Sequence, residues 1–114
     1  MTLQHTEIAV VGGGMVGGAL ALGLAQQGFE VTVIEQAAPA EFDPTAKPDV
    51  RISAISAASV DLLRGLGVWE AVLDMRAHPY SRLETWEWEN AHVAFDAAEL
   101  KLPRLGYMVE NNVL

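Results

Sequence analysis

A glycine-rich stretch near the start of the chain carries the first residues whose spacing points to chemistry. Six consecutive residues beginning at Gly12 read Gly-Gly-Gly-Met-Val-Gly, which matches the pattern G-x-G-x-x-G. In this pattern Gly12 permits a tight turn, Gly14 leaves room for a pyrophosphate against the backbone, and Gly17 lets a helix pack closely. Met15 and Val16 would open that helix, where unpaired N–H groups and a partial positive charge attract phosphate. The motif therefore predicts a pyrophosphate-binding loop.

Glu35 supplies the second half of a dinucleotide-binding signature. It lies 35 − 14 = 21 residues after Gly14, at a distance where an acidic side chain can accept hydrogen bonds from the adenosine ribose hydroxyls. The same carboxylate would repel a 2′-phosphate, which favours FAD or NAD over NADP. A glycine turn next to a solvated acid is the alternative interpretation, and the flanking elements argue against it.

Those flanking residues predict the elements that the loop requires. Residues 8–11 are a short apolar run suited to a buried parallel strand. Small apolar residues at 19–27 suit a helix, and Gly28 is placed to end it. Residues 31–35 form a second β-branched run. A strand–loop–helix–strand of this length predicts a βαβ unit with a right-handed crossover, typical of a Rossmann-like α/β fold.

The middle of the chain predicts a loop followed by two helices. Residues 36–50 contain three prolines and two aspartates, which favours a surface loop. Ser56 is placed to cap a helix over 57–64, ended by glycine. A second short helix is expected at 68–75.

The last third of the chain changes its pattern. Alternating aromatic and apolar residues at 82–96 predict an antiparallel hairpin. Trp86 and Trp88 would share one face of it, because side chains two apart on a strand point the same way. Residues 110–114 contain neither glycine nor proline and suggest the opening of an amphipathic helix. We therefore expect the chain to be a fragment of a longer protein.

Composition excludes several classes of function. The 114 residues, 51% hydrophobic and 19% charged, suit one globular domain at most. A formal net charge of −8 opposes nucleic-acid binding, and the absence of cysteine removes disulfides and thiolate metal sites. The three histidines are scattered without metal-ligand spacing. With no apolar run of membrane-spanning length and no basic start of a signal peptide, a cytoplasmic location is expected.

Three further segments carry a resemblance to a known family. They read DVRISAIS at 49–56, RLETWEWE at 82–89 and GYMVEN at 106–111. With them, the sequence resembles the aromatic-ring hydroxylases of ubiquinone biosynthesis, which are single-component FAD-dependent monooxygenases with the p-hydroxybenzoate hydroxylase fold. The similarity runs over essentially the whole chain and corresponds to the N-terminal part of such an enzyme.

The resemblance implies roles for individual residues. The three motif glycines and Glu35 would hold the ADP part of FAD, and Arg51 would lie near the pyrophosphate and ribose, where a guanidinium suits phosphate oxygens. Asn111 would face the flavin or the pyrophosphate. The implied reaction uses NAD(P)H as electron donor and hydroxylates a polyprenyl quinol ring, with the demanding chemistry supplied by the flavin. No catalytic acid, base or nucleophile is expected within 1–114.

The same resemblance sets expectations for domains and partners. Residues 1–114 would be the N-terminal part of an FAD-binding domain, with the hairpin at about 82–96 from an inserted or substrate-side layer and the substrate domain absent. Such a piece would be inactive and would self-associate through exposed apolar surfaces. The complete enzyme would associate peripherally with the inner membrane or with a ubiquinone-biosynthesis complex. Two alternatives remain open: an NAD- or FAD-dependent oxidoreductase of another subfamily, such as an amine oxidase or reductase, and a truncated chain that binds nothing.

Overall fold

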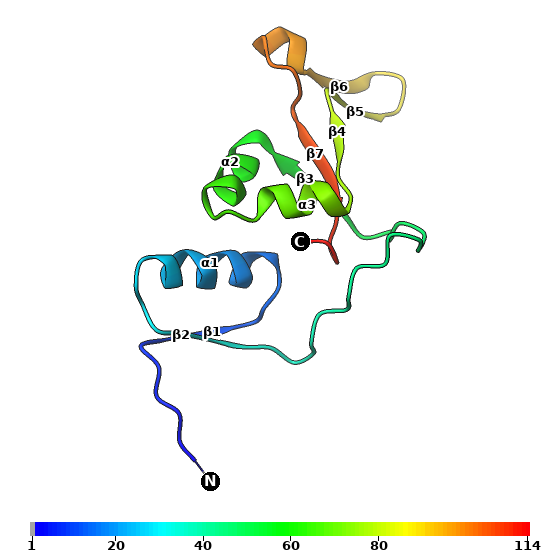
Figure 1. Cartoon of the computed structure of the whole chain (residues 1–114). Helices are drawn as coiled ribbons and strands as arrows, with labels where there is room; N and C mark the ends of the chain where they lie inside the picture. Colours follow the sequence, from blue (N-terminus) through cyan, green and yellow to red (C-terminus); the bar gives the residue numbers. More distant parts are fainter. Residues whose placement is uncertain (1) are drawn as a thin grey trace.

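The computed structural model describes residues 2–114, which form three parts along one long axis (Figure 1). One end holds β1 (Ile8–Val11), α1 (Met15–Gln26) and β2 (Val31–Ile34). The middle holds β3 (Ile52–Ser56), α2 (Ala57–Gly65), α3 (Trp69–Met75), β4 (His78–Tyr80) and β7 (Gly106–Glu110). The far end holds β5 (Arg82–Glu87), β6 (Ala91–Asp96) and the 3-10 turn η1 (Ala97–Leu100).

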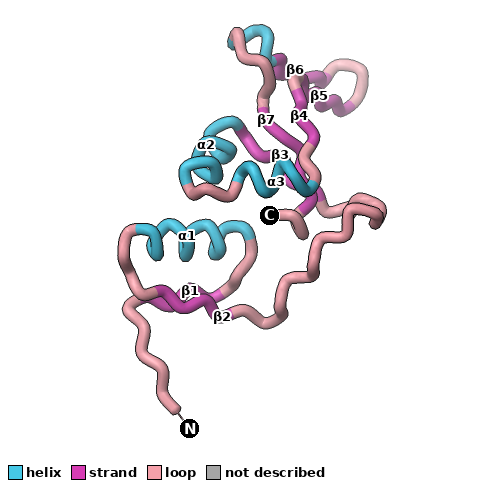
Figure 2. The backbone as a smooth tube through the Cα atoms, in the orientation of Figure 1, coloured by secondary structure: helices cyan, strands magenta, loops and turns pink. Residues whose placement is uncertain are grey.

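The chain is extended for its length. Its principal dimensions are 63 × 31 × 29 Å and its radius of gyration is 17.7 Å, against about 13 Å for a compact domain of this size. Figure 2 shows the reason, because the βαβ unit and the hairpin lie at opposite ends of the central layer. The three parts therefore share little buried surface.

The βαβ unit forms as the sequence predicts. β1 and β2 pair in parallel, with Ile8 opposite Val31 and Val11 opposite Ile34. α1 connects the two strands and lies along one face of them (Figure 1). The helix begins at Met15, as the motif predicts, so that Gly17 and Gly18 lie in its first turn.

The hydrophobic core lies in the middle part. β3, β7 and β4 form an antiparallel sheet in that order. Trp69 on α3 is 0% exposed, and its ring meets the Tyr107 ring edge-on at a centroid distance of 5.0 Å. Val72 and Val109 are buried in the same cluster. The helices α2 and α3 and the central strand β7 thus pack around Trp69.

The helix boundaries of the middle part follow from local chemistry. The Ser56 hydroxyl accepts a hydrogen bond from the Ser59 N–H at 3.3 Å, so it caps α2 as expected. Gly67 has φ +83°, a left-handed conformation that ends the helix region. The predicted loop at 36–50 and the short helix that follows α2 are also present.

Three expectations for the rest of the chain were wrong or incomplete. The strands β3, β4 and β7 were not predicted, because each pairs only with a segment distant in sequence. The expected helix at 110–114 is instead the last residue of β7 followed by a turn. Trp88 does not share a strand face with Trp86, since it lies in the hairpin turn at φ +58°. The hairpin itself is confirmed, with Arg82 opposite Asp96.

Trp69 provides the first testable prediction. Replacing it by alanine removes the side chain around which the core is packed, so we expect Trp69→Ala to lower the free energy of unfolding by about 3–5 kcal/mol. Trp88→Ala is the matched control, because Trp88 is 85% exposed and its loss should cost no more than about 0.5 kcal/mol. Urea unfolding of both variants measures the difference, and equal costs would contradict this description of the core.

Candidate functional site

The glycine loop is shaped by one close approach between backbone segments. Gly12 has φ +101°, which favours glycine, and its N–H continues the sheet by donating to the Ile34 carbonyl at 2.8 Å. A Cβ on Gly17 would lie 2.0 Å from the Gly12 carbonyl oxygen. No side chain fits there, so α1 can rest against the loop only with glycine at this position.

The start of α1 presents free donors to the solvent. Gly14 is its N-cap, no side chain caps the helix, and no acidic residue lies in its first turn. The N–H groups of Met15, Val16 and Gly17 have no intrahelical acceptor, as at every helix start. A Cβ on Gly14 would meet nothing within 4 Å, so the space next to Gly14 is open. Free donors, a positive helix end and open space fit a phosphate group.

Glu35 lies where β2 ends and its carboxylate reaches the loop. Oε2 accepts a hydrogen bond from the Gly13 N–H at 2.5 Å, and Oε1 accepts one from the Gln36 N–H at 2.8 Å. These backbone donors, Gly13 above all, hold the pKa of Glu35 below its ordinary value. The group is therefore ionised at neutral pH, and its remaining lone pairs can accept hydroxyl hydrogens. The structure thus brings together the loop and the acid that the sequence singled out.

Arg51 and Asn111 form a second cluster at the end of the β3–β7 ladder. The Asn111 N–H donates to the Arg51 carbonyl at 2.9 Å, and the Asn111 side-chain oxygen accepts from the Ser53 hydroxyl at 2.6 Å. The Arg51 side chain is exposed and has no ion-pair partner among residues 2–114. Sequence reasoning chose both residues without predicting that they would touch, and it missed Ser53 altogether.

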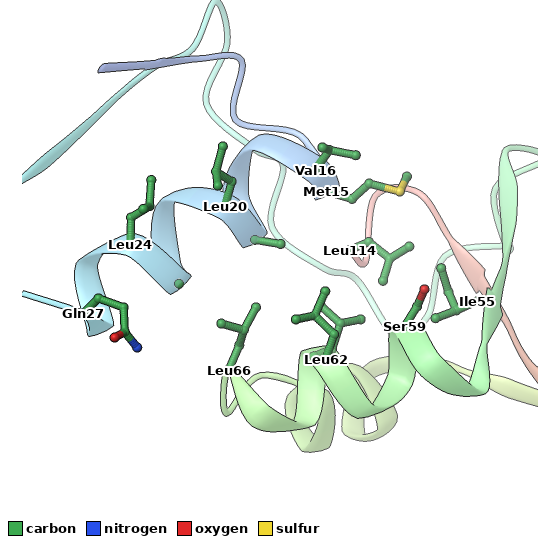
Figure 3. A pocket seen from close by; sticks show the side chains of 13 residues that line it. Met15, Val16, Leu20, Leu24, Gln27, Ile55, Ser59, Leu62, Leu66 and Leu114 are labelled. Atoms are coloured by element: carbon green, nitrogen blue, oxygen red, sulfur yellow. The ribbon is translucent and has the colours of Figure 1, made fainter. Parts of the chain in front are cut away.

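A cavity connects the glycine loop with the turn that follows Asn111. It has a volume of about 340 Å³, and Gly13, Gly14, Val113 and Leu114 contribute to its wall. A larger apolar groove of about 610 Å³ runs between α1 and α2, with Leu62 and Leu66 directed toward α1 (Figure 3). The loop therefore faces the C-terminal turn across open space.

Other polar groups in the described part of the chain do not form a metal site. No three potential ligands among its His, Asp and Glu side chains come together to hold a metal ion. Glu84 on the hairpin is engaged by His92 and by Arg82, and these hydrogen bonds, that of His92 first, lower its pKa. Across residues 2–114, none of the helices combines the length and apolar character needed to cross a membrane. What the site offers is binding groups.

The family model described as an FAD binding domain matches residues 5–109. The chain belongs to the FAD-binding domain family. This membership selects FAD from the dinucleotides that the glycine loop and Glu35 left open, and the open space at Gly14 with its free N–H groups fits the cofactor's pyrophosphate.

Two relatives of this FAD-binding domain are informative. The 3-demethoxyubiquinol 3-hydroxylase of Escherichia coli is 79% identical over 114 residues, which cover 100% of this chain and 29% of that protein. The mitochondrial ubiquinone biosynthesis monooxygenase COQ6 of Danio rerio is 33% identical over 95% of this chain and 23% of its own length. The chain thus spans less than a third of these curated relatives.

Solved structures support the fold. A PqsL variant from Pseudomonas aeruginosa superposes with a TM-score of 0.68 at 20% identity, covering 96% of this chain and 28% of that one. The p-nitrophenol 4-monooxygenase PnpA of Pseudomonas putida gives 0.62 at 24% identity, covering 93% and 26%. Both likenesses concern the fold alone.

Two glycines of the loop should respond differently to the same substitution. Gly17→Ala forces a methyl group into the Gly12 carbonyl, and we expect it to reduce the free energy of unfolding by about 1–3 kcal/mol. Gly14→Ala meets no protein atom within 4 Å, so it should leave stability unchanged but weaken ADP binding by filling the phosphate space. Thermal unfolding and ADP titration of both variants check this, and unchanged ADP affinity in Gly14→Ala would contradict the assignment.

Proposed function

We propose that this chain is the N-terminal, ADP-holding part of the FAD-binding domain of a flavin monooxygenase that hydroxylates a polyprenyl benzoquinol ring in ubiquinone biosynthesis. The proposal of FAD as the cofactor rests on one observation. The Glu35 carboxylate is hydrogen-bonded to Gly13 in the loop, next to the free N–H groups at the start of α1. The names of the two ubiquinone-pathway relatives support the substrate class.

Different residues of the chain bind different parts of the cofactor. The backbone N–H groups at Gly14, Met15, Val16 and Gly17 receive the pyrophosphate, and Gly12 makes the turn that presents them. The Glu35 carboxylate accepts the ribose hydroxyls. Arg51 and Asn111 serve the pyrophosphate and flavin side. When bound, FAD supplies the redox and oxygen chemistry, with NAD(P)H as electron donor to the complete enzyme.

This chain itself contributes binding and orientation. No acid, base or nucleophile in it is assigned a chemical step, so the 114-residue chain alone is proposed to be inactive. The substrate domain lies in the remainder of the longer protein, and the hairpin of β5 and β6 belongs to an inserted or substrate-side layer. Peripheral association with the inner membrane or with a biosynthetic complex is part of the same proposal.

The ribose role of Glu35 can be tested in the intact natural protein. Wild type should purify with FAD absorbance. Glu35→Ala removes hydrogen bonds to an ionised acceptor, so affinity for FAD and ADP should each fall by about tenfold or more. Because the repulsion between the Glu35 carboxylate and a 2′-phosphate also disappears, the preference for ADP over its 2′-phosphorylated analogue should shrink. Glu41→Ala, which removes an exposed acid in the nearby loop, is the matched control, and an equal loss in both variants would refute the assignment.

The lowered pKa of Glu35 also leads to a prediction about pH. Its hydrogen bonds depress the folded-state pKa of Glu35, so the stability that they contribute is present above the unfolded pKa and disappears as pH falls through the folded value. The factor by which Glu35→Ala weakens ADP binding, in which the titration of ADP itself cancels, should therefore remain constant from neutral pH down through the ordinary carboxyl range and shrink only below it. Titration of ADP across this range measures the effect, and a midpoint above the ordinary carboxyl pKa would contradict it.

Self-association of the isolated chain is the last part of the proposal. α1 is apolar nearly all round, yet its Leu20 is 54% exposed, and Leu62 on α2 points toward α1 across the open groove (Figure 3). An apolar surface of this kind favours association with a second copy. Light scattering of the 114-residue chain should show a mass that rises with concentration. Leu20→Gln should weaken the effect, whereas Leu3→Gln in the N-terminal tail should not, and a monodisperse monomer would count against the idea.

A further inference from the structure

A buried ion pair joins the end of α3 to the end of β7. Arg76 Nε lies 3.1 Å from Glu110 Oε2, and the two side chains are 29% and 6% exposed. Glu110 Oε2 has no well-directed hydrogen bond, so charge attraction dominates the contact. Glu110 is also the one buried charged residue in the described part of the chain. An unpaired carboxylate at this position would be costly, which ties Glu110 closely to Arg76.

The same guanidinium holds the loop between β2 and β3. Its two terminal nitrogens donate to the carbonyls of Ala46 and Asp43 at 3.2 and 3.4 Å. It also lies over the Phe42 ring, 5.2 Å from the centroid. The Arg76 side chain thus bonds a long proline-containing loop to the end of α3.

From Glu110, a series of hydrogen bonds leads to the second cluster of the site. Glu110 Oε1 accepts from the Asp49 N–H at 2.7 Å, and the Asp49 carboxylate accepts from the Arg51 N–H at 3.1 Å. The Arg51 carbonyl in turn accepts from the Asn111 N–H. Each group fixes the backbone of the next, and Arg51 and Asn111 stand at the end of the series.

We propose that Arg76 is a positioning residue for the pyrophosphate and flavin side of the cofactor. Paired with Glu110, it fixes the backbone from which Arg51 and Asn111 approach FAD, and this inference rests on the proposed function of those two residues. The AMP part of the cofactor is independent of Arg76. The loop and Glu35 are held by contacts within residues 12–37, none of which involves Arg76.

The independence of the two halves makes the proposal testable in the intact natural protein. Arg76→Met leaves the Glu110 carboxylate buried and unpaired, so it should lower both stability and FAD affinity. The double variant Arg76→Met with Glu110→Gln removes that charge and keeps an acceptor for Asp49. Its melting temperature should recover, while its FAD dissociation constant stays raised by about tenfold. Affinity for AMP, which lacks the second phosphate of the pyrophosphate, should change by less than about twofold in all variants.

Two further variants separate positioning from general damage. Arg76→Lys retains the charge next to Glu110 but loses the two-carbonyl fork, so it should recover part of the FAD affinity. Arg104→Met is the matched control, because Arg104 also lies over an aromatic ring, that of Tyr107, but does not touch the loop. Its FAD affinity should equal that of wild type.

The outcomes distinguish this inference from the proposed function. If wild type binds FAD but the double variant binds it equally well, or if FAD and AMP affinities fall by the same factor, Arg76 does not act by positioning. If wild type binds ADP or NADH but no FAD, the proposed function fails, and the inference falls with it. A raised FAD dissociation constant with unchanged AMP affinity supports both.

Discussion

The contact between Gly17 and the Gly12 carbonyl sets the geometry on which the site depends. Because no Cβ fits between them, α1 lies directly on the loop that leaves β1. That position places the free N–H groups of its first turn next to the open space at Gly14. It also brings the loop to the end of β2, where Glu35 can bond to Gly13. The free donors at the start of α1 and the nearby Glu35 carboxylate are therefore consequences of one packing constraint.

The site must attract an anionic cofactor although the chain carries a net charge of −8. At physiological ionic strength, exposed charges act over about 8 Å, so distant carboxylates are largely screened. What matters locally is the first turn of α1, which has no acidic residue. The one nearby acid, Glu35, has its charge partly satisfied by backbone donors. Local donors thus outweigh the overall charge.

The sequence predicted the parts of the fold that are encoded locally. The glycine motif, Glu35 and the cap at Ser56 each act within a few residues or one βαβ unit, so their patterns are readable. The strands β3 and β7 could not be predicted in this way, because Ile52 pairs with Glu110, far along the chain. No turn motif in the sequence indicates that these two segments pair. The roles of Glu110 and Arg76 had no sequence signal at all. The position of Trp88 was missed because alternation cannot reveal where a left-handed turn residue interrupts a strand.

The different spans of the two clusters have a consequence for the order of folding. The bond between Gly13 and Glu35 closes 22 residues, whereas that between Ser53 and Asn111 closes 58 and that between Asp49 and Glu110 closes 61. Contacts that close longer loops carry a larger entropic cost and form more slowly. During synthesis from the N-terminus, both partners of the Gly13–Glu35 bond are therefore available before the strand that completes the second cluster has emerged.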